Sequence, residues 1–295
     1  MTSASTRVGF VGLGRMGVPM ARQLIDRGFD VIVFNRSPAP AEAFANDTGA
    51  ARATTPRELA ECADVVVTML ASGSALMEVL DGDDSLCAGL SAGTVVIDMG
   101  TTGIEFTKMA RARLADSQAD LVEAPVSGST AAAESRALLV MMGGEDHAVE
   151  IARPVLEGIA DRVVHMGGPG TGAAMKLAVN AVLFGINQAV AESLVMAESA
   201  GIDRSTAYDI FATSAVAAPV VLYRRSVFEH PGTTPVTFSI DLAVKDLQLI
   251  LDLATSVGAV MPQTETNIHQ LRDAVADGLG SCDMGDIAVH LRGAS

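Results

Sequence analysis

The chain has 295 residues, 49% of them hydrophobic, and its formal net charge is −15, from 20 basic and 35 acidic residues. This length favours about two domains with a sizeable buried core. The acidic balance excludes nucleic acid and anionic membrane surfaces as expected partners, because both repel a negatively charged protein.

The composition does not indicate a disulfide framework, a metal site or a membrane span. Cys62, Cys87 and Cys282 are odd in number and far apart, which is typical of a reducing cytoplasm. The five histidines show no metal-ligand spacing, so no metal is expected. The longest apolar run, 173–190, contains four polar side chains, which argues against a transmembrane helix. Because only a short polar tail precedes the first strand, no signal peptide is expected, and we predict a cytoplasmic location.

The first motif is a glycine-rich turn between an apolar strand, 7–11, and a helix, 18–27, followed by a second strand over 30–34. Its sequence Gly12-Leu13-Gly14-Arg15-Met16-Gly17 fits the G-x-G-x-x-G dinucleotide fingerprint in the required strand–helix–strand context. The first glycine makes the turn and the second lets the backbone approach a pyrophosphate. The third lets helix and strand touch, and the helix N-terminus then faces the negative charge.

The residues after the second strand indicate which dinucleotide is bound. An NAD site places a carboxylate there for the ribose 2′-hydroxyl. Here the chain has Asn35-Arg36-Ser37, in which Arg36 and Ser37 are able to bind a 2′-phosphate. We therefore predict NADP(H), with NAD(H) as the alternative cofactor and a solvated loop arginine as the alternative role of Arg36.

Apolar strands alternate with helices through the rest of the first half. Strands are expected over 64–70, 94–99, 119–122, 138–142 and 162–166, with helices over 74–80, 105–117 and 146–158 among the connections. The alternation predicts a Rossmann-type, doubly wound, mostly parallel sheet. Ligands of such sheets bind beyond the strand carboxyl ends, where loops 69–71, 98–102 and 124–129 are expected. Loop 124–129 suits a carboxylate, and ordinary turns are the alternative for all three.

One long helix is expected to begin near Thr171, after a glycine-rich stretch, and to continue to about residue 200. Because it is apolar on nearly every side, it is expected to be mostly buried. Lys176, Asn180 and Asn187 fall within about 40° of one another, so they form one narrow polar stripe. A lysine at this place is paired or functional, or else its amine reaches solvent from the helix start.

The chain beyond the long helix shows only helical periodicity, over 203–212, 220–228, 239–257, 264–277 and 284–291. We therefore predict a dinucleotide-binding Rossmann domain, 1–167, and an all-α substrate and oligomerisation domain, 168–295, joined by the long helix. Two apolar helical faces exceed what so small an all-α unit covers, so a homodimer or tetramer is expected.

Four ordered motifs, which together cover essentially the whole chain, resemble those of the β-hydroxyacid dehydrogenase family. This family includes 3-hydroxyisobutyrate dehydrogenases, tartronate semialdehyde reductases and glyoxylate/succinic semialdehyde reductases. The motifs are Gly9 to Gly17 for the cofactor, Glu123 to Ser129 for the substrate, Gly172-x-x-x-Lys176-x-x-x-Asn180 for catalysis, and Lys245-Asp246-Leu247 near the C-terminus.

The resemblance implies hydride transfer between NADP(H) and a small β-hydroxyacid or aldehyde acid. Lys176 would be the catalytic acid/base, and Asn180 would help to bind the substrate. The other implied substrate-binding residues are Ser127, Gly128 and Ser129, which would hold the carboxylate, with Phe238 and Asp246, which match the semialdehyde-reductase branch. The implied cofactor-binding residues are Gly12, Leu13, Gly14, Arg15, Met16, Gly17, Asn35, Arg36, Ser37, Met69, Leu70, Thr101 and Lys245.

The chain departs from the family pattern at Gly100, where serine is usual, at Ala71, where proline is common, and in the turn 134–136. Ser129 replaces a glycine that 3-hydroxyisobutyrate dehydrogenases usually have. These departures leave the substrate open. Two other functions also stay open: an NADPH-dependent imine reductase, against which Lys176 argues, and a non-catalytic NADP(H)-binding sensor.

Overall fold

The computed structural model describes residues 6–293, and the chain forms two compact units, Met1–Lys176 and Leu177–Ser295. The division falls inside the long helix α9 (Thr171–Ser199), which begins in unit 1 and continues through unit 2. The boundary inferred from the sequence, between residues 167 and 168, precedes this helix and stays a prediction.

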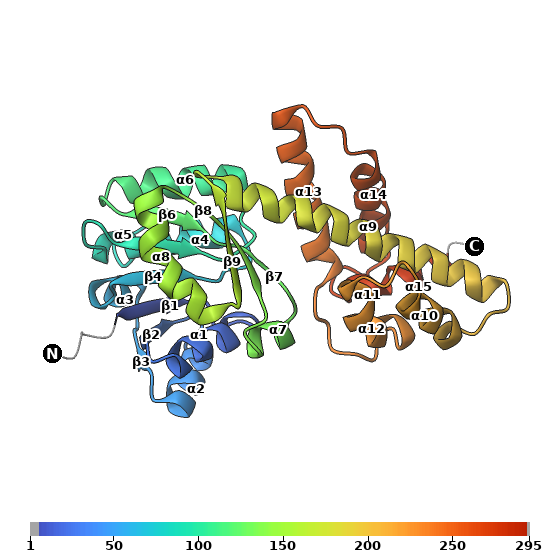
Figure 1. Ribbon diagram of the computed structural model, residues 1–295, viewed down its shortest axis with the longest axis horizontal. Helices are drawn as coiled ribbons and strands as arrows, with labels where there is room; N and C mark the ends of the chain where they lie inside the picture. The colour runs from blue at the N-terminus through green and yellow to red at the C-terminus, as the bar shows by residue number, and fades with distance from the viewer. Residues whose placement is uncertain (1–5, 294–295) are drawn as a thin grey trace. The chain divides into compact units, whose positions relative to one another are not determined.

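Unit 1 alternates strands with helices along the chain (Figure 1). Its strands are β1 (Arg7–Val11), β2 (Asp30–Phe34), β3 (Ala51–Arg52), β4 (Val65–Thr68), β5 (Val95–Asp98), β6 (Asp120–Glu123), β7 (Val126–Ser127), β8 (Leu139–Gly143) and β9 (Arg162–Gly167). The helices that precede α9 are α1 (Gly17–Asp26), α2 (Pro38–Thr48), α3 (Pro56–Cys62), α4 (Gly73–Leu80), α5 (Leu86–Gly89), α6 (Ile104–Ala115), α7 (Thr130–Glu134) and α8 (Asp146–Ile159).

The strands form one sheet in the order β3-β2-β1-β4-β5-β6-β8-β7, with β9 paired to β8. Strands β1 to β6 run parallel to one another, whereas β8 is antiparallel to β6 and β7 and parallel to β9. The mostly parallel, doubly wound sheet predicted from the sequence is therefore confirmed. Its parallel strands bring the loops after β1, β2, β4, β5 and β6 to one edge, where ligands of such sheets bind.

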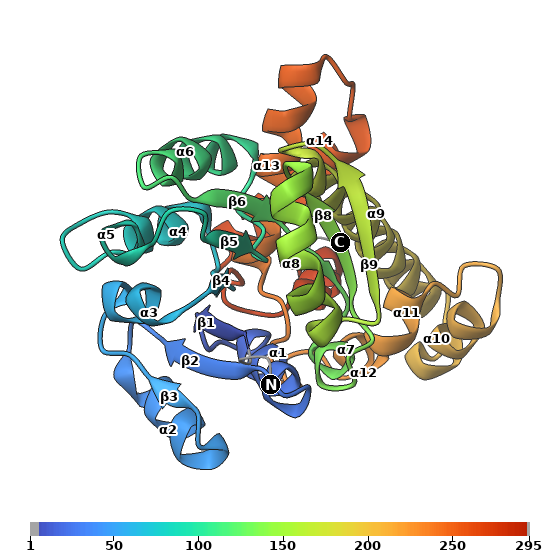
Figure 2. The same ribbon diagram turned by 60° about the vertical axis from the view of Figure 1, so that its left-hand side comes forward.

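Helices cover both faces of this sheet (Figure 2), because strand side chains alternate between two separate apolar clusters. In β4, for example, Val65 and Val67 pack with α1 and α8, whereas Val66 packs with α3, α4, α5 and α6. A strand that is buried on both faces has the continuous apolar sequence of a parallel sheet.

Unit 2 is helical, as predicted. After α9 it contains α10 (Arg204–Thr213), α11 (Pro219–Tyr223), α12 (Arg225–Glu229), α13 (Ile240–Val257), α14 (Pro262–Ala276), the 3₁₀ turn η1 (Met284–Asp286) and α15 (Ile287–Gly293). The single helix expected over 220–228 is wrong, because the helix breaks at Arg224. This arginine has the backbone angles φ −92° and ψ 2°, and its buried guanidinium pairs with Asp283.

The prediction that α9 is mostly buried is also wrong. By length and composition it alone among residues 6–293 is apolar enough to cross a membrane, but only 39% of its most apolar window is buried. Val182 and Met196 are 64% and 69% exposed, respectively. Apolar composition alone does not tell how much of a helix one chain covers. The buried side carries Asn180 and Asn187, which donate hydrogen bonds to Asp246 and to the carbonyl oxygen of Met284, so α9 is the central helix of unit 2.

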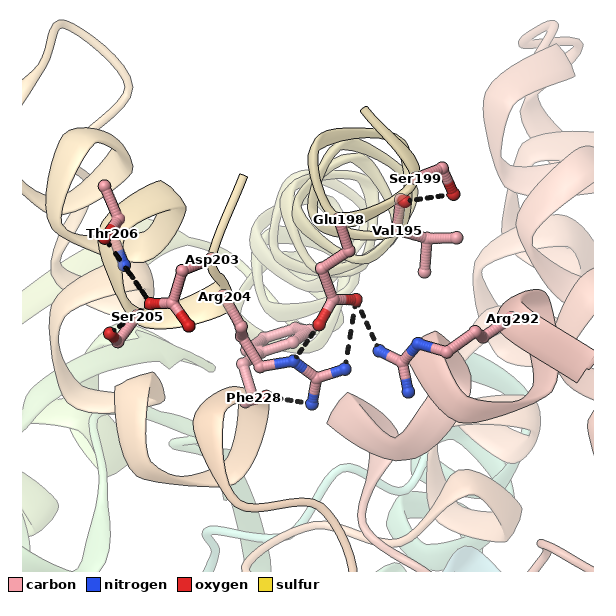
Figure 3. A network of polar contacts seen from close by, with 9 residues as sticks. All are labelled: Val195, Glu198, Ser199, Asp203, Arg204, Ser205, Thr206, Phe228 and Arg292. Atoms are coloured by element: carbon pink, nitrogen blue, oxygen red, sulfur yellow. Dashed lines mark hydrogen bonds and ion pairs between the residues drawn. The ribbon is translucent and has the colours of Figure 1, made fainter. Parts of the chain in front are cut away.

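One carboxylate ties the C-terminal end of α9 to two other helices, α10 and α15 (Figure 3). Glu198 accepts hydrogen bonds from Arg204 at 2.6 and 3.1 Å and from Arg292 at 2.7 Å. Arg204 also donates to the carbonyl oxygen of Phe228, 3.0 Å away. The arginines of α10 and α15 therefore neutralise an acid at a helix C-terminus, where the macrodipole disfavours it.

Candidate active site

The glycine-rich turn between β1 and α1 has the geometry that a dinucleotide site requires. Gly12 has φ +101°, and a Cβ there would overlap the carbonyl oxygen of Met69. A Cβ at Gly17 would overlap the carbonyl oxygen of Gly12, so only glycine allows this close contact of helix and strand. A Cβ at Gly14 would meet nothing within 4 Å, which leaves space beside the N-terminus of α1. These residues fit a bound pyrophosphate.

The segment after β2 adjoins this turn. Asn35 Oδ1 accepts a hydrogen bond from the backbone N–H of Leu13 at 3.0 Å, and its Nδ2 donates to the carbonyl oxygen of Ser37 at 2.9 Å. Arg36 is 84% exposed and lies 3.2 Å from Glu78. Asn35 thus orders the loop that carries Arg36 and Ser37 beside the glycine turn. Arg15 and Met16 lie on the turn itself, at the start of α1.

The loops after β4 and β5 lie against the same turn. A Cβ at Gly12 would lie 2.4 Å from the carbonyl oxygen of Met69 and 3.1 Å from the Leu70 side chain, and a Cβ at Gly100 would lie 2.7 Å from the carbonyl oxygen of Leu70. Glycine at position 100, a departure from the family pattern, therefore fits a close contact between two loops. Thr101 is the next residue and is half-buried.

Asp98, the last residue of β5, holds this loop. Its Oδ1 accepts hydrogen bonds from Thr68 Oγ1 at 2.9 Å and from the backbone N–H of Gly100 at 3.3 Å, and its Oδ2 accepts from Thr102 Oγ1 at 2.8 Å. The carboxylate is almost fully buried. Sequence reasoning missed this role. The available signal was an acid that follows three buried apolar strand residues and precedes two threonines.

The loop after β6 contains the residues expected to hold a carboxylate. Ser127 lies in β7 and pairs with Leu139 of β8. Gly128 has φ +143°, and a Cβ there would lie 2.7 Å from Leu138, so this exposed position favours glycine. The hydroxyl of Ser129 accepts a hydrogen bond from the backbone N–H of Ala132 at 3.3 Å. That contact caps α7, which gives Ser129 a structural role whatever else it does.

Within α9, Lys176 is the last residue of unit 1 and is half-buried. Asn180, one turn further on, is only 4% exposed and donates to Asp246 Oδ2 at 2.8 Å. The other carboxylate oxygen of Asp246 lies 2.9 Å from Lys245 Nζ. Unit 2 thus brings together Asn180, Lys245 and Asp246. Phe238 contacts Phe184 of α9, with ring centroids 6.0 Å apart.

The predicted residues therefore gather into two sets. Unit 1 brings the residues of the glycine turn together with Asn35, Met69, Leu70 and the Thr101 loop, and Thr130, next to Ser129, lies 3.9 Å from the sulfur of Met16. Unit 2 assembles Asn180 with Asp246 and Lys245. Within residues 6–293, no group of three or more His, Cys, Asp or Glu side chains is arranged to hold a metal ion.

Comparison with known proteins covers both halves of the chain. Residues 7–168 match the NAD binding domain of 6-phosphogluconate dehydrogenase, and residues 170–291 match the NAD-binding domain of NADP-dependent 3-hydroxyisobutyrate dehydrogenase. The chain belongs to the 3-hydroxyisobutyrate dehydrogenase-like family of β-hydroxyacid dehydrogenases. The family resemblance of the four sequence motifs is thereby confirmed, and the chain is an NAD(P)-binding oxidoreductase of a family that acts on CH–OH groups.

Three family relatives illustrate the range of similar proteins. 3-Sulfolactaldehyde reductase of Escherichia coli is 32% identical over 97% of this chain and 95% of its own length. The chloroplastic glyoxylate/succinic semialdehyde reductase 2 of Arabidopsis thaliana is 29% identical over 99% of this chain and 83% of its own. The crystal structure of 3-hydroxyisobutyrate dehydrogenase from Salmonella typhimurium superposes with a TM-score of 0.89 at 25% identity, covering 96% of this chain and 99% of that one.

Proposed function

We propose that this chain is an NADP(H)-dependent enzyme that transfers hydride between the nicotinamide and a small β-hydroxyacid or aldehyde acid, with Lys176 as the general acid/base. The observation that carries the proposal is Gly172-x-x-x-Lys176-x-x-x-Asn180 at the start of α9 in a member of this family. The chain has only three lysines, and two of them, Lys176 and Lys245, fall in family motifs.

Reduction of an aldehyde requires a hydride and a proton, and the nicotinamide supplies the hydride when it is bound. Negative charge then develops on the carbonyl oxygen. The Lys176 ammonium stabilises this charge and donates the proton to that oxygen. In the direction of oxidation, the neutral amine of Lys176 accepts the hydroxyl proton.

The names of the relatives suggest the class of substrate. 3-Sulfolactaldehyde, glyoxylate and succinic semialdehyde each combine an aldehyde with an acidic group on a short chain. We infer that Ser127, Gly128 and Ser129 bind the acidic group, which fixes the carbonyl for hydride transfer. Asn180 binds the substrate through a side chain whose orientation Asp246 sets, and Phe238 lies near the substrate.

For the cofactor we propose a preference for NADP(H) over NAD(H). Arg36 is exposed beside the glycine turn, and its ion pair with Glu78 at 3.2 Å is a weak surface contact that a phosphate can replace. Ser37 offers a hydroxyl next to it. The residues Met69, Leu70, Thr101 and Lys245 keep the cofactor roles that the family resemblance implies.

We also propose that the enzyme is cytoplasmic and homo-oligomeric, with no nucleic acid or membrane partner. The three cysteines are thiols. The oligomer is supported by apolar side chains that α9 leaves exposed.

The test is a panel of small aldehyde acids and hydroxyacids, each assayed with NADPH/NADP and NADH/NAD, on the wild type and on Lys176→Ala. Loss of the acid/base should lower kcat by roughly 10²- to 10⁴-fold while NADPH affinity persists. Lys108→Ala is the matched control, because Lys108 is an exposed lysine of α6 paired with Glu105.

Near-wild-type turnover by Lys176→Ala would refute the role of Lys176. Reduction of a cyclic imine in preference to every aldehyde acid would favour an imine reductase. NADPH binding without turnover of any substrate would favour a sensor.

A further inference from the structure

Glu123 is a buried acid for which the proposed chemistry has no use. It is the last residue of β6 and is only 2% exposed. It directly precedes the loop 124–129, which carries Ser127 and Gly128. A carboxylate is almost never buried unless it is paired, so its partners indicate what it does.

One oxygen of Glu123 binds the start of α9. Its Oε2 accepts a hydrogen bond from the backbone N–H of Gly170 at 2.9 Å. The carbonyl oxygen of Gly170 accepts the first intrahelical bond of α9, from the N–H of Ala174 at 3.0 Å, so Gly170 occupies the N-cap position. Glycine has no side chain with which to cap a helix. The carboxylate of Glu123, which belongs to β6, therefore takes the place of an N-cap side chain. Its negative charge suits the helix N-terminus.

Two glycines let the first turn of α9 lie directly against the sheet at this point. A Cβ at Gly143, which pairs with Glu123 across β6 and β8, would lie 2.6 Å from the backbone nitrogen of Gly172 and 2.7 Å from Glu123 Oε2. A Cβ at Gly172 would lie 2.6 Å from the carbonyl oxygen of Met141 and 3.0 Å from that of Glu123. Backbone contacts this close leave little freedom for the helix start to shift.

The other oxygen of Glu123 is held from α6. Arg111 Nη2 lies 2.8 Å from Glu123 Oε1 and also donates to the carbonyl oxygen of Leu121. Burial raises the pKa of Glu123 above its ordinary value, against the opposing effects of the Gly170 hydrogen bond and of Arg111. The guanidinium thus favours the ionised form of this buried acid.

We propose that Glu123 is a positioning residue that holds the first turn of α9, and with it Lys176, at a fixed place relative to the loop of Ser127 and Gly128. Lys176 lies six residues after Gly170, on the same rigid helix, and the loop begins one residue after Glu123. A single carboxylate therefore connects the proton donor to the segment that binds the acidic group of the substrate. This inference rests on the proposed function of Lys176.

The kinetic test is Glu123→Gln. The amide oxygen still accepts from Gly170, but the amide NH₂ then faces the Arg111 guanidinium, donor against donor, so the helix start loosens. We expect the pH-independent maximum of kcat to fall roughly 10- to 100-fold, because a displacement of about 1 Å has effects of this size. The KM for NADPH should stay within twofold.

Two further variants separate positioning from other effects. Leu114→Ala removes a buried side chain of α6, one turn from Arg111, and should lower thermal stability while keeping the maximum of kcat. Arg111→Met removes the second partner of Glu123 at a less buried position, and it should also lower kcat. It therefore provides the test in case Glu123→Gln does not fold. If the plot of kcat against pH for Glu123→Gln is only shifted along the pH axis and its maximum is unchanged, the effect is purely electrostatic and the proposal is overturned.

A measurement without turnover keeps this inference distinct from the proposed function. With three lysines in the chain, reductive ¹³C-methylation gives few side-chain NMR signals, and the Lys108 signal serves as the internal reference. At a pH where the lysine amines are fully protonated, Glu123→Gln should change the chemical shift of the Lys176 signal and leave that of Lys108 unchanged. An unmoved Lys176 signal refutes positioning by Glu123. Normal turnover by Lys176→Ala refutes the proposed function instead, whatever the NMR result.

Discussion

At the scale of single residues, Asn35 and Asp283 show how one side chain can place several segments. Asn35 binds the backbone of Leu13 and of Ser37, so the glycine turn and the loop after β2 keep a fixed relation. Arg36, between them, forms an exposed ion pair with Glu78. An exposed pair of this kind contributes little to stability, so Arg36 is available for a ligand.

Arg36→Ala tests the choice of cofactor. Loss of a charged hydrogen bond to a 2′-phosphate costs roughly 1.5–3 kcal/mol, so the Kd for NADPH should rise about tenfold or more while that for NADH stays within twofold. Binding titrations measure both constants. Arg22→Ala, which removes an arginine of α1 paired with Asp47, is the control. Equal affinity of the wild type for NADH and NADPH would contradict the predicted preference.

Asp283 is a buried acid of unit 2 that accepts four hydrogen bonds and also forms an ion pair with an arginine. It accepts from the N–H and Oγ1 of Thr237 at 2.8 Å each, from the N–H of Phe238 at 3.2 Å and from that of Gly285 at 3.0 Å, and it pairs with Arg224. Burial raises its pKa, but Arg224 and the hydrogen bonds lower it more, so the net pKa lies below the ordinary 3.8. The segment that contains Phe238 is thus fixed by an ionised group.

This pKa shift predicts a pH dependence of stability. A depressed carboxyl pKa stabilises the fold fully above the unfolded value near 3.8, and the stabilisation is lost as the pH falls toward the folded pKa. Asp283→Asn should destabilise unit 2 by about 3 kcal/mol at pH 7, because it leaves Arg224 buried without its counter-charge. Its difference in Tm from the wild type should narrow below pH 4. Asp116→Asn, at an exposed surface acid, is the control, and a difference independent of pH would contradict the assignment.

At the scale of elements, α9 is fixed at both ends by carboxylates. Glu123 caps its first turn, and Glu198 near its end binds Arg204 of α10 and Arg292 of α15 (Figure 3). Asn180 and Asn187 hold the middle against Asp246 and the Met284 backbone. The 29-residue helix that carries Lys176 is thereby held at several points along its length, by unit 1 at its start and by unit 2 beyond Leu177.

Glu198→Ala tests the anchor at the C-terminal end. Two arginines lose their carboxylate, and we expect unit 2 to lose roughly 2 kcal/mol of unfolding free energy, measured by urea denaturation. Asp273→Ala, at an exposed acid of α14, should change stability little. Turnover per folded molecule should stay normal for both, since neither residue belongs to the proposed site. An unchanged urea midpoint for Glu198→Ala would show that this network contributes nothing to stability.

At the scale of the whole molecule, the exposed side of α9 is the feature that a single chain leaves unexplained. Six of its exposed or half-buried positions follow one another at intervals of three, four, three, four and seven residues, close to the spacing of a helix–helix seam: Met175, Ala178, Val182, Gly185, Ala189 and Met196. Small residues in such a seam let two helices approach closely. A second copy of the chain is the occupant that we propose for it.

The double variant Val182→Lys/Met196→Lys tests this proposal. Two charges in the seam should shift the molar mass measured by light scattering toward that of one chain, 30.3 kDa. Val260→Lys, at an 84% exposed valine outside α9, should leave the assembly intact. A wild type that is monomeric at micromolar concentration, or a double variant that stays assembled, would refute the seam.

The sequence by itself determined the class of fold, the order of its longer strands and helices, and the family, but not the short strands β3 and β7. Local patterns suffice for these: the period of apolar residues separates β1 to β6 from α9 to α15, and the glycine turn needs Gly12, Gly14 and Gly17 whatever surrounds it. The motif around Lys176 was readable for the same reason, because its spacing lies within one helix.

Only the tertiary structure decided which polar side chains hold the candidate site in place. Asp98, Glu123 and Asp283 each bind a residue far away along the chain: Thr68, Gly170 and Thr237 lie 30, 47 and 46 residues from them, respectively. It also decided that α9 is half uncovered and that the helix expected over 220–228 breaks at Arg224. Burial and hydrogen bonding between distant segments depend on the whole packing, whereas periodicity depends only on neighbours along the chain.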